Sequence, residues 1–151
     1  MDEKSINENE IFTKMAKQFF NHTWELLDKK ERTQNEIDEM IHSAHASRFL
    51  WGKVGKPLNF ERGEWQISRV YSVLNRSEPA FYHAKRCLAI CLENNIEDFD
   101  IAFAYEAMAR AHSTAGNIEE KEKYLTLAKS AGEKIKEKDD KNYFLSELET
   151  I

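Results

Sequence analysis

The chain has 151 residues, of which 41% are hydrophobic and 32% are charged, with a formal net charge of −5 and a pI near 5.6. This length suits one domain with a substantial core, and the acidic balance argues against nucleic acid as a partner. No stretch reaches the roughly 20 apolar residues that cross a membrane. The first ten residues lack the basic and apolar order of a signal peptide. We therefore expect a cytoplasmic protein that binds neither membranes nor nucleic acid.

Hydrophobic periodicity and the scarcity of glycine and proline predict one all-α domain over residues 1–151. The sequence TQNE, from Thr33 to Glu36, is typical of a capping box that opens a helix. We expect six helices in three antiparallel hairpins, over residues 8–30 and 34–54, 60–75 and 78–94, and 98–115 and 118–138. A short C-terminal helix, at about residues 140–149, is expected to cover an exposed end.

One long loop is predicted at residues 52–63, which hold three of the five glycines and one of the two prolines. Loops of this length in small domains are either functional or plain spacers between elements. Both interpretations stay open for this segment.

The clearest repeat-like pattern lies in residues 98–132, which resemble a tetratricopeptide repeat. The positions that carry the resemblance are Met108, Ala109, Gly116, Leu125 and Ala128. His112 stands where a tyrosine is usual, and Lys121 replaces the usual alanine.

The same register fits residues 61–94, where the matching positions are Ile67, Ser68, Tyr71, Asn75, Ala80, Ala84 and Cys87. Residues 8–54 would then form a third, degenerate hairpin. The resemblance implies antiparallel helical hairpins stacked as a short right-handed superhelix. Residues 98–115 are apolar on most sides, so we expect this helix at the centre of the stack.

In tetratricopeptide proteins the first helix of each repeat lines a concave groove. By that resemblance, the groove residues here would be Arg62, Trp65, Arg69 and Ser72, followed by Phe103, Glu106, Arg110 and Ser113. The function implied is a protein- or peptide-binding scaffold. Because arginines bind carboxylates and phosphates well, we expect a partner with an acidic or carboxylate group, and a homodimer is an alternative occupant.

Arg69 and Arg110 occupy the same position in the two copies, so the stack should bring them together. Glu106 can balance one of them, which predicts one unmet positive charge for a ligand. Replacing either arginine should then abolish partner capture at little cost in stability. The alternative is an internal network, in which Glu106 pairs with Arg110 one helical turn away.

The segment HSAHASRFLWGKVG, from His42 to Gly55, offers a different hypothesis. His42 and His45 are the candidates for a metal or small-ligand site in a helical bundle. Their i, i+3 spacing, with the other histidines scattered, leads us to expect no metal and no cofactor. Arg48 falls on the apolar stripe of its helix and needs an acidic partner, for which Glu64 is the candidate.

Cys87 and Cys91 lie one helical turn apart and are the only cysteines of the chain. We interpret them as small core residues of a reduced protein. The sequence contains no phosphate-binding loop, no dinucleotide-binding glycine pattern and no nucleophile elbow, so we do not expect an enzyme.

Overall fold

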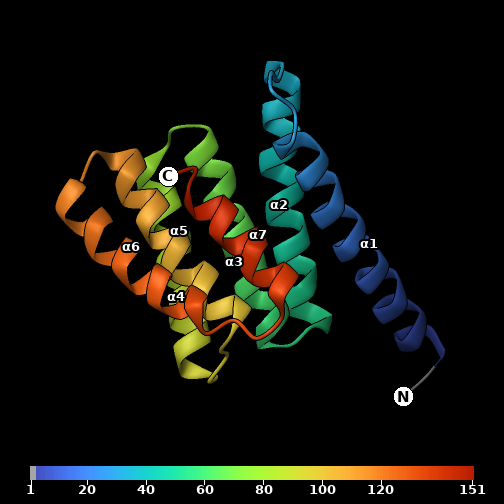
Figure 1. Ribbon diagram of the computed structural model, residues 1–151. Coiled ribbons are helices and arrows are strands. Elements are labelled where there is room, and N and C mark those ends of the chain that lie inside the picture. Colours follow the sequence, from blue (N-terminus) through green and yellow to red (C-terminus); the bar gives the residue numbers. More distant parts are fainter. Residues whose placement is uncertain (1–2) are drawn as a thin grey trace.

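A computed structural model describes residues 3–151, with side chains from residue 7 onward. This part of the chain forms seven α-helices and no strand (Figure 1). They are α1 (Glu3–Leu27), α2 (Gln34–Val54), α3 (Pro57–Val73), α4 (Ser77–Glu93), α5 (Phe99–Ala115), α6 (Ile118–Glu133) and α7 (Lys138–Leu148). Consecutive helices α1–α2, α3–α4 and α5–α6 pack as hairpins, and the hairpins pack on one another. The all-α fold of stacked hairpins is confirmed.

Helix α5 is the centre of the molecule, as predicted, because it packs against α3, α4, α6 and α7. Most of its residues are buried, and its small side chains allow close approach: these are Ala102, Ala104, Ala107, Ala109 and Ala111. Phe103 and Met108 fill the remaining space on either side.

Several helix ends lie where the capping and turn residues of the sequence predict them. The capping box at Thr33 is present, with Glu36 N donating to Thr33 Oγ1 and Thr33 N donating to Glu36 Oε1. The predicted turns at Asn75 and Gly116 both have positive φ, at 60° and 76°. Gly116 caps α5 in the left-handed conformation, which glycine adopts without a steric penalty.

The prediction of a long loop at residues 52–63 is wrong, because only residues 55 and 56 separate α2 from α3. Pro57 is the first residue of α3, a position where its fixed φ suits a helix and its missing N–H is not needed. Gly63 lies inside α3, where a Cβ atom would come within 2.8 Å of Arg48 Cδ. This glycine therefore allows α2 and α3 to approach closely, and it does not end a helix.

Helix α7 follows the last hairpin and packs against both of its helices, α5 and α6. In Figure 1 it lies between α5 and α2. The ring of Phe144 is fully buried against Ala102, Phe103 and Ala128. A Cβ atom at Gly132 of α6 would lie only 2.6 Å from Phe144 Cδ1. Helix α6 ends at Glu133, earlier than the predicted residue 138. This early end lets the chain turn so that α7 folds back onto α5 and α6.

Among the described residues, no helix combines the length and the apolar character that a membrane-spanning helix requires.

Replacing Gly132 with alanine should weaken the docking of α7. Glycine-to-alanine changes inside a helix usually stabilise by about 0.5–1 kcal/mol, but here the added methyl overlaps the Phe144 ring. We expect a loss of about 1–3 kcal/mol in the free energy of unfolding, as in other overpacked cores. Urea denaturation measures this loss, and hydrogen exchange should rise in residues 138–148. Ser130→Ala, at an exposed site on the same helix, is the control. A Gly132→Ala protein as stable as the wild type would contradict this packing.

Replacing Thr33 with alanine removes the hydroxyl that accepts from Glu36 N at 3.2 Å. We expect the free energy of unfolding to fall by about 1 kcal/mol, since the first turn of α2 loses a cap. Thermal and urea denaturation measure the change. Thr33→Ser keeps the acceptor and should stay close to wild type; equal losses in both variants would show that the cap is not the cause.

Candidate functional site

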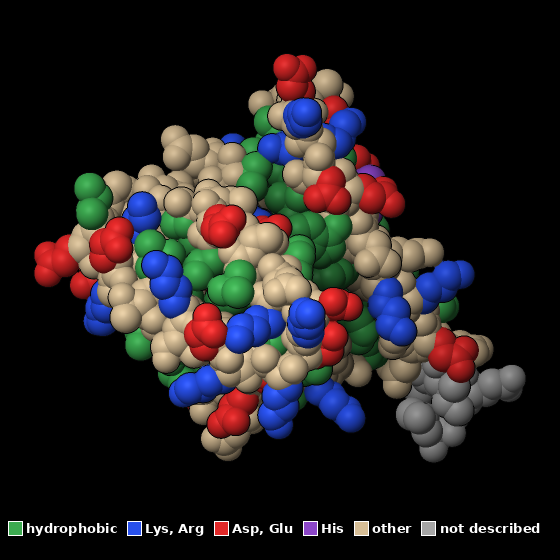
Figure 2. All heavy atoms as spheres, viewed as in Figure 1, with side chains coloured by type: hydrophobic (Ala, Val, Ile, Leu, Met, Phe, Trp, Pro, Cys, Tyr) green, Lys and Arg blue, Asp and Glu red, His purple; other side chains and the backbone are tan. Residues whose placement is uncertain are grey.

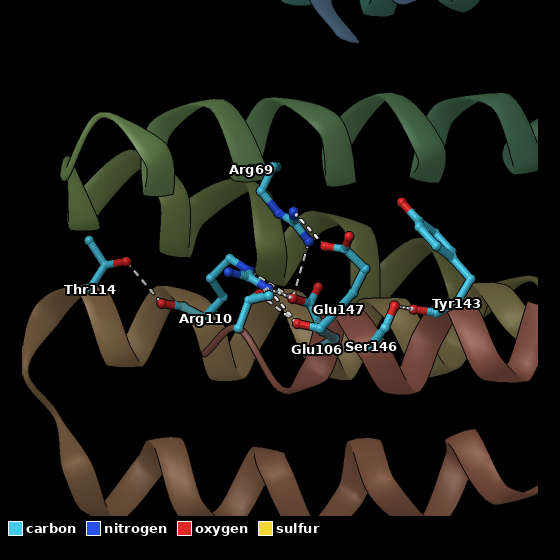
Figure 3. A network of polar contacts seen from close by, with 8 residues as sticks. Arg69, Glu106, Arg110, Thr114, Tyr143, Ser146 and Glu147 are labelled. Carbon is cyan, nitrogen blue, oxygen red and sulfur yellow. Dashed lines mark hydrogen bonds and ion pairs between the residues drawn. The ribbon is translucent and has the colours of Figure 1, made fainter. Parts of the chain in front are cut away.

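The carboxylate of Glu106 on α5 is completely buried and lies between two arginines (Figure 3). Its Oε1 atom accepts from Arg110 Nε at 2.7 Å and from Arg69 Nη2 at 3.3 Å. The prediction that Arg69 and Arg110 lie close together is therefore confirmed. Both guanidinium groups bind this one oxygen, whereas Oε2 is buried without a hydrogen-bond partner among the described residues. A buried carboxylate needs such paired cations to compensate for its loss of hydration.

A second carboxylate, Glu147 of α7, completes the group (Figure 3). Arg69 Nη1 donates to Glu147 Oε2 at 3.0 Å, while Arg110 Nη2 donates to the Glu147 carbonyl at 3.1 Å and to Thr150 Oγ1 at 2.7 Å. Two arginines thus meet two carboxylates. The prediction of one unmet positive charge is wrong, because Glu147, which lies outside both repeats, balances it. We call Arg69, Glu106, Arg110 and Glu147 the arginine–glutamate network.

Beside this network, aromatic rings from four helices form a row. Trp65 of α3 lies 5.3 Å from Trp24 of α1 and 5.3 Å from Phe103 of α5, measured between ring centroids. Tyr143 of α7 follows at 5.8 Å from Phe103. The guanidinium of Arg69 lies 5.6 Å from the Trp65 ring, so the network and the row are in contact.

These rings line a cavity of about 570 Å³, which we call the aromatic cavity. Its aromatic walls are Phe20, Trp24, Trp65, Phe99, Phe103 and Tyr143. Hydrophobic side chains gather in the hollow between α7 and the α1–α2 hairpin (Figure 2). Helix α7 therefore forms one wall of this cavity and leaves it open to solvent along its edge.

The polar residues that line the aromatic cavity are mostly acidic: Glu61, Glu97, Asp98, Asp100 and Asp140. Arg62 is the one cation among the lining residues, and it is already paired, with Nε and Nη2 at 2.8 Å and 3.0 Å from the two oxygens of Asp100. The cavity is therefore electronegative as well as aromatic.

Burial raises the pKa of Asp100, whereas the hydrogen bonds from Arg62 lower it. On balance, the pKa of Asp100 is below its ordinary value. Burial, followed by the neighbouring Asp100 carboxylate, raises the pKa of Glu61 far above its ordinary value. Of the two neighbouring carboxyls, Asp100 holds the charge and Glu61 holds the proton.

Asp98 shapes the rim of the aromatic cavity in an unusual backbone conformation, with φ of 61°. Its Oδ1 atom accepts from the backbone N–H of Lys136 at 3.0 Å, just before α7 begins. A non-glycine residue at positive φ is strained and needs such support from its surroundings. The turn between α4 and α5 and the start of α7 therefore hold each other in place at this rim.

The two predicted groove serines, Ser72 and Ser113, belong neither to the arginine–glutamate network nor to the lining of the aromatic cavity. Ser72 Oγ is buried without a hydrogen-bond partner among the described residues. Ser113 is half-buried on α5 and lies outside the lining of the aromatic cavity. Sequence reasoning missed Trp24, Tyr143 and the acids of the cavity, since they lie outside the positions that the repeat pattern singles out.

The histidine-rich segment of α2 is part of the packing between the first two hairpins. Arg48 Nε lies 3.6 Å from Glu64 Oε2, so its predicted acidic partner is confirmed. His45 Nε2 hydrogen-bonds to Tyr71 OH at 2.9 Å, whereas His42 is exposed. The His45 side chain is therefore held by Tyr71 where the hairpins pack, whereas the His42 side chain faces solvent.

Comparison of the chain with protein-family models, with curated proteins and with solved structures yields no match. What the site can bind therefore follows from its own geometry and charge.

Glu106→Gln should be the most damaging isosteric change in the arginine–glutamate network. It leaves Arg69 and Arg110 facing each other with only Glu147 to balance them, and breaking a buried pair costs about 3–5 kcal/mol. Glu147→Gln is the matched control, because its side chain is 24% exposed and Glu106 remains. Urea denaturation should show a clearly larger loss for Glu106→Gln.

Contrary to the expectation from the sequence, alanine at Arg69 or Arg110 should also reduce stability, because Glu106 loses a partner. Equally small losses in all of these variants would contradict the network as a structural element.

Proposed function

We propose that the protein is a binding module whose aromatic cavity receives a cationic side chain of a peptide. The observation that carries this proposal is the combination of ring walls from four helices with acidic side chains, in a cavity whose one lining cation is already paired to Asp100. The proposal keeps the peptide-binding role implied by the repeat resemblance and reverses the expected charge of the ligand.

Aromatic faces and carboxylates favour the same kind of guest. A cation within about 6 Å of a Trp or Tyr ring gains roughly 0.5–2 kcal/mol, and more when water is excluded. Glu97 and Asp140 at the cavity add attraction for a positive charge. A carboxylate guest would be repelled by the same groups, and Arg69 and Arg110 are already balanced by Glu106 and Glu147.

A second hollow supports a peptide rather than an isolated amine. A cavity of about 430 Å³ lies between α1, α3 and α7 and shares Trp24 and Tyr143 with the aromatic cavity. The two hollows therefore adjoin and extend along α7 beyond the space of one side chain. Leu27 and Val73 line the second hollow and offer apolar contact to a neighbouring residue of the peptide.

The proposal assigns a binding role without catalysis. A cytoplasmic location fits it, because Cys87 and Cys91 are free thiols. A homodimer is the second candidate: a basic side chain of another copy would then occupy the cavity.

The test is isothermal titration calorimetry with short peptides that differ only in one central residue. Peptides with lysine, arginine or trimethyllysine should bind, and those with acetyl-lysine or glutamate should not. Asp140→Asn should weaken the cationic peptides roughly two- to fivefold, the size expected for one partly exposed charge. Asp139→Asn, an exposed neighbour outside the cavity lining, is the control.

Two results would overturn the proposal. Equal binding of the lysine and acetyl-lysine peptides would remove the role of charge. Tetramethylammonium that binds as tightly as the peptides would show a small-amine site and no contribution from the second hollow. Analytical ultracentrifugation of the unliganded protein separates the homodimer from the peptide module.

A further inference from the structure

Three side chains with metal-binding atoms converge between α3 and α4. They are Glu61, Cys87 and Cys91, all buried, and their ligand atoms lie within 4.8 Å of one another. Cys87 and Cys91 occupy successive turns of α4, which places both thiols on the same face of that helix. Glu61 of α3 faces them, with Cys87 Sγ at 3.4 Å from Glu61 Oε2.

We propose that Glu61, Cys87 and Cys91 form a zinc site. In a tetrahedral zinc centre, a sulfur at about 2.3 Å and a carboxylate oxygen at about 2.0–2.2 Å from the metal lie about 3.5 Å apart. The distance of 3.4 Å between Cys87 Sγ and Glu61 Oε2 matches that separation. Two thiolates select zinc over magnesium or calcium, which prefer oxygen ligands.

An independent observation concerns the other carboxyl oxygen of Glu61. The residue is only 1% exposed, and its Oε1 atom has no hydrogen-bond partner among the described residues. A buried oxygen without a partner costs free energy, and Glu61 Oε1 is one of seven buried side-chain atoms in this state among the described residues. A cation bound at this cluster would contact the Glu61 carboxyl group, whose Oε2 atom otherwise accepts only from the Cys87 thiol.

The neighbouring arginine does not fill that role. Arg62 Nε is 3.9 Å from Glu61 Oε1, beyond hydrogen-bond distance, and only 2.8 Å from Asp100 Oδ1. Asp100 thus holds the guanidinium away from Glu61. Three deprotonated ligands would carry three negative charges, of which zinc neutralises two, whereas the cluster without a metal must stay protonated.

The cluster lies between two cavities, and its own three residues are at most 1% exposed. Glu61 belongs to the lining of the aromatic cavity, and Cys91 lines a separate cavity of about 640 Å³ next to α5 and α6. Three protein ligands also leave a fourth tetrahedral position for water or for a ligand atom. The sequence directed attention to His42 and His45 instead, because the spacing of the two cysteines is also that of ordinary core residues on one helix face.

The test uses untagged, reduced protein stripped with a chelator and then given Zn²⁺ alone or Co²⁺ alone. Native mass spectrometry should show one zinc per chain. The cobalt form should show the intense near-ultraviolet band of thiolate-to-cobalt charge transfer. Cys91→Ala should lose both the band and the bound zinc, whereas the His42→Gln/His45→Gln double variant should keep them.

The wild-type result alone can overturn the proposal: less than one equivalent of zinc, or a cobalt form without the charge-transfer band, excludes this site. Retention of the band in Cys91→Ala would also exclude it. Glu61→Gln, which preserves the shape of the side chain, is the second variant, and circular dichroism of both metal-free variants checks that they fold. Zinc should raise the melting temperature of the wild type and leave that of the variants unchanged. The peptide titrations are carried out with a chelator present, so that they test the proposed peptide binding without bound zinc.

Discussion

The buried charge of Glu106 is the constraint on which the inner face of this protein depends. A carboxylate with no exposed surface needs cations beside it, and Arg110 of the same helix provides one. The second cation, Arg69, comes from α3 and so fixes the second hairpin against the third. Two arginines then call for another acid, which α7 provides through Glu147. Because α7 is held there, Tyr143 forms part of the wall of the aromatic cavity.

The parts of the fold that could be predicted from the sequence are those with local causes. The helices follow from hydrophobic periodicity, the start of α2 from the hydroxyl of Thr33, and the end of α5 from Gly116. The prediction of a loop at residues 52–63 was wrong because glycine and proline also occur within helices. Pro57 is the first residue of α3, and Gly63 allows α2 and α3 to pack closely. The role of Gly63 depends on Arg48 in the neighbouring helix, which the local sequence does not reveal.

The same distinction applies to the site. The repeat resemblance placed Trp65 and Arg69 on the same groove-lining face, and in the structure the Arg69 guanidinium lies 5.6 Å from the Trp65 ring. The resemblance could not show the sign of the charge there, since the balancing acid Glu147 and the acids of the cavity rim, Asp98 and Asp140, lie outside the repeat positions. The cluster of Glu61 with the two cysteines likewise arises from packing between α3 and α4, which no spacing within one segment reveals.

The ion pair between Arg62 and Asp100 links the two proposed sites. By holding the guanidinium at 2.8 Å, Asp100 removes the one lining cation from the aromatic cavity and also keeps it from Glu61. The acidity of the cavity and the unpartnered oxygen of Glu61 thus share a cause. Since Glu61 also lines the cavity, zinc bound with three deprotonated ligands would leave one net negative charge beside the cationic guest, where the protonated metal-free cluster is neutral. Zinc and the guest would then strengthen each other's binding by the same factor, because coupling between two sites is reciprocal.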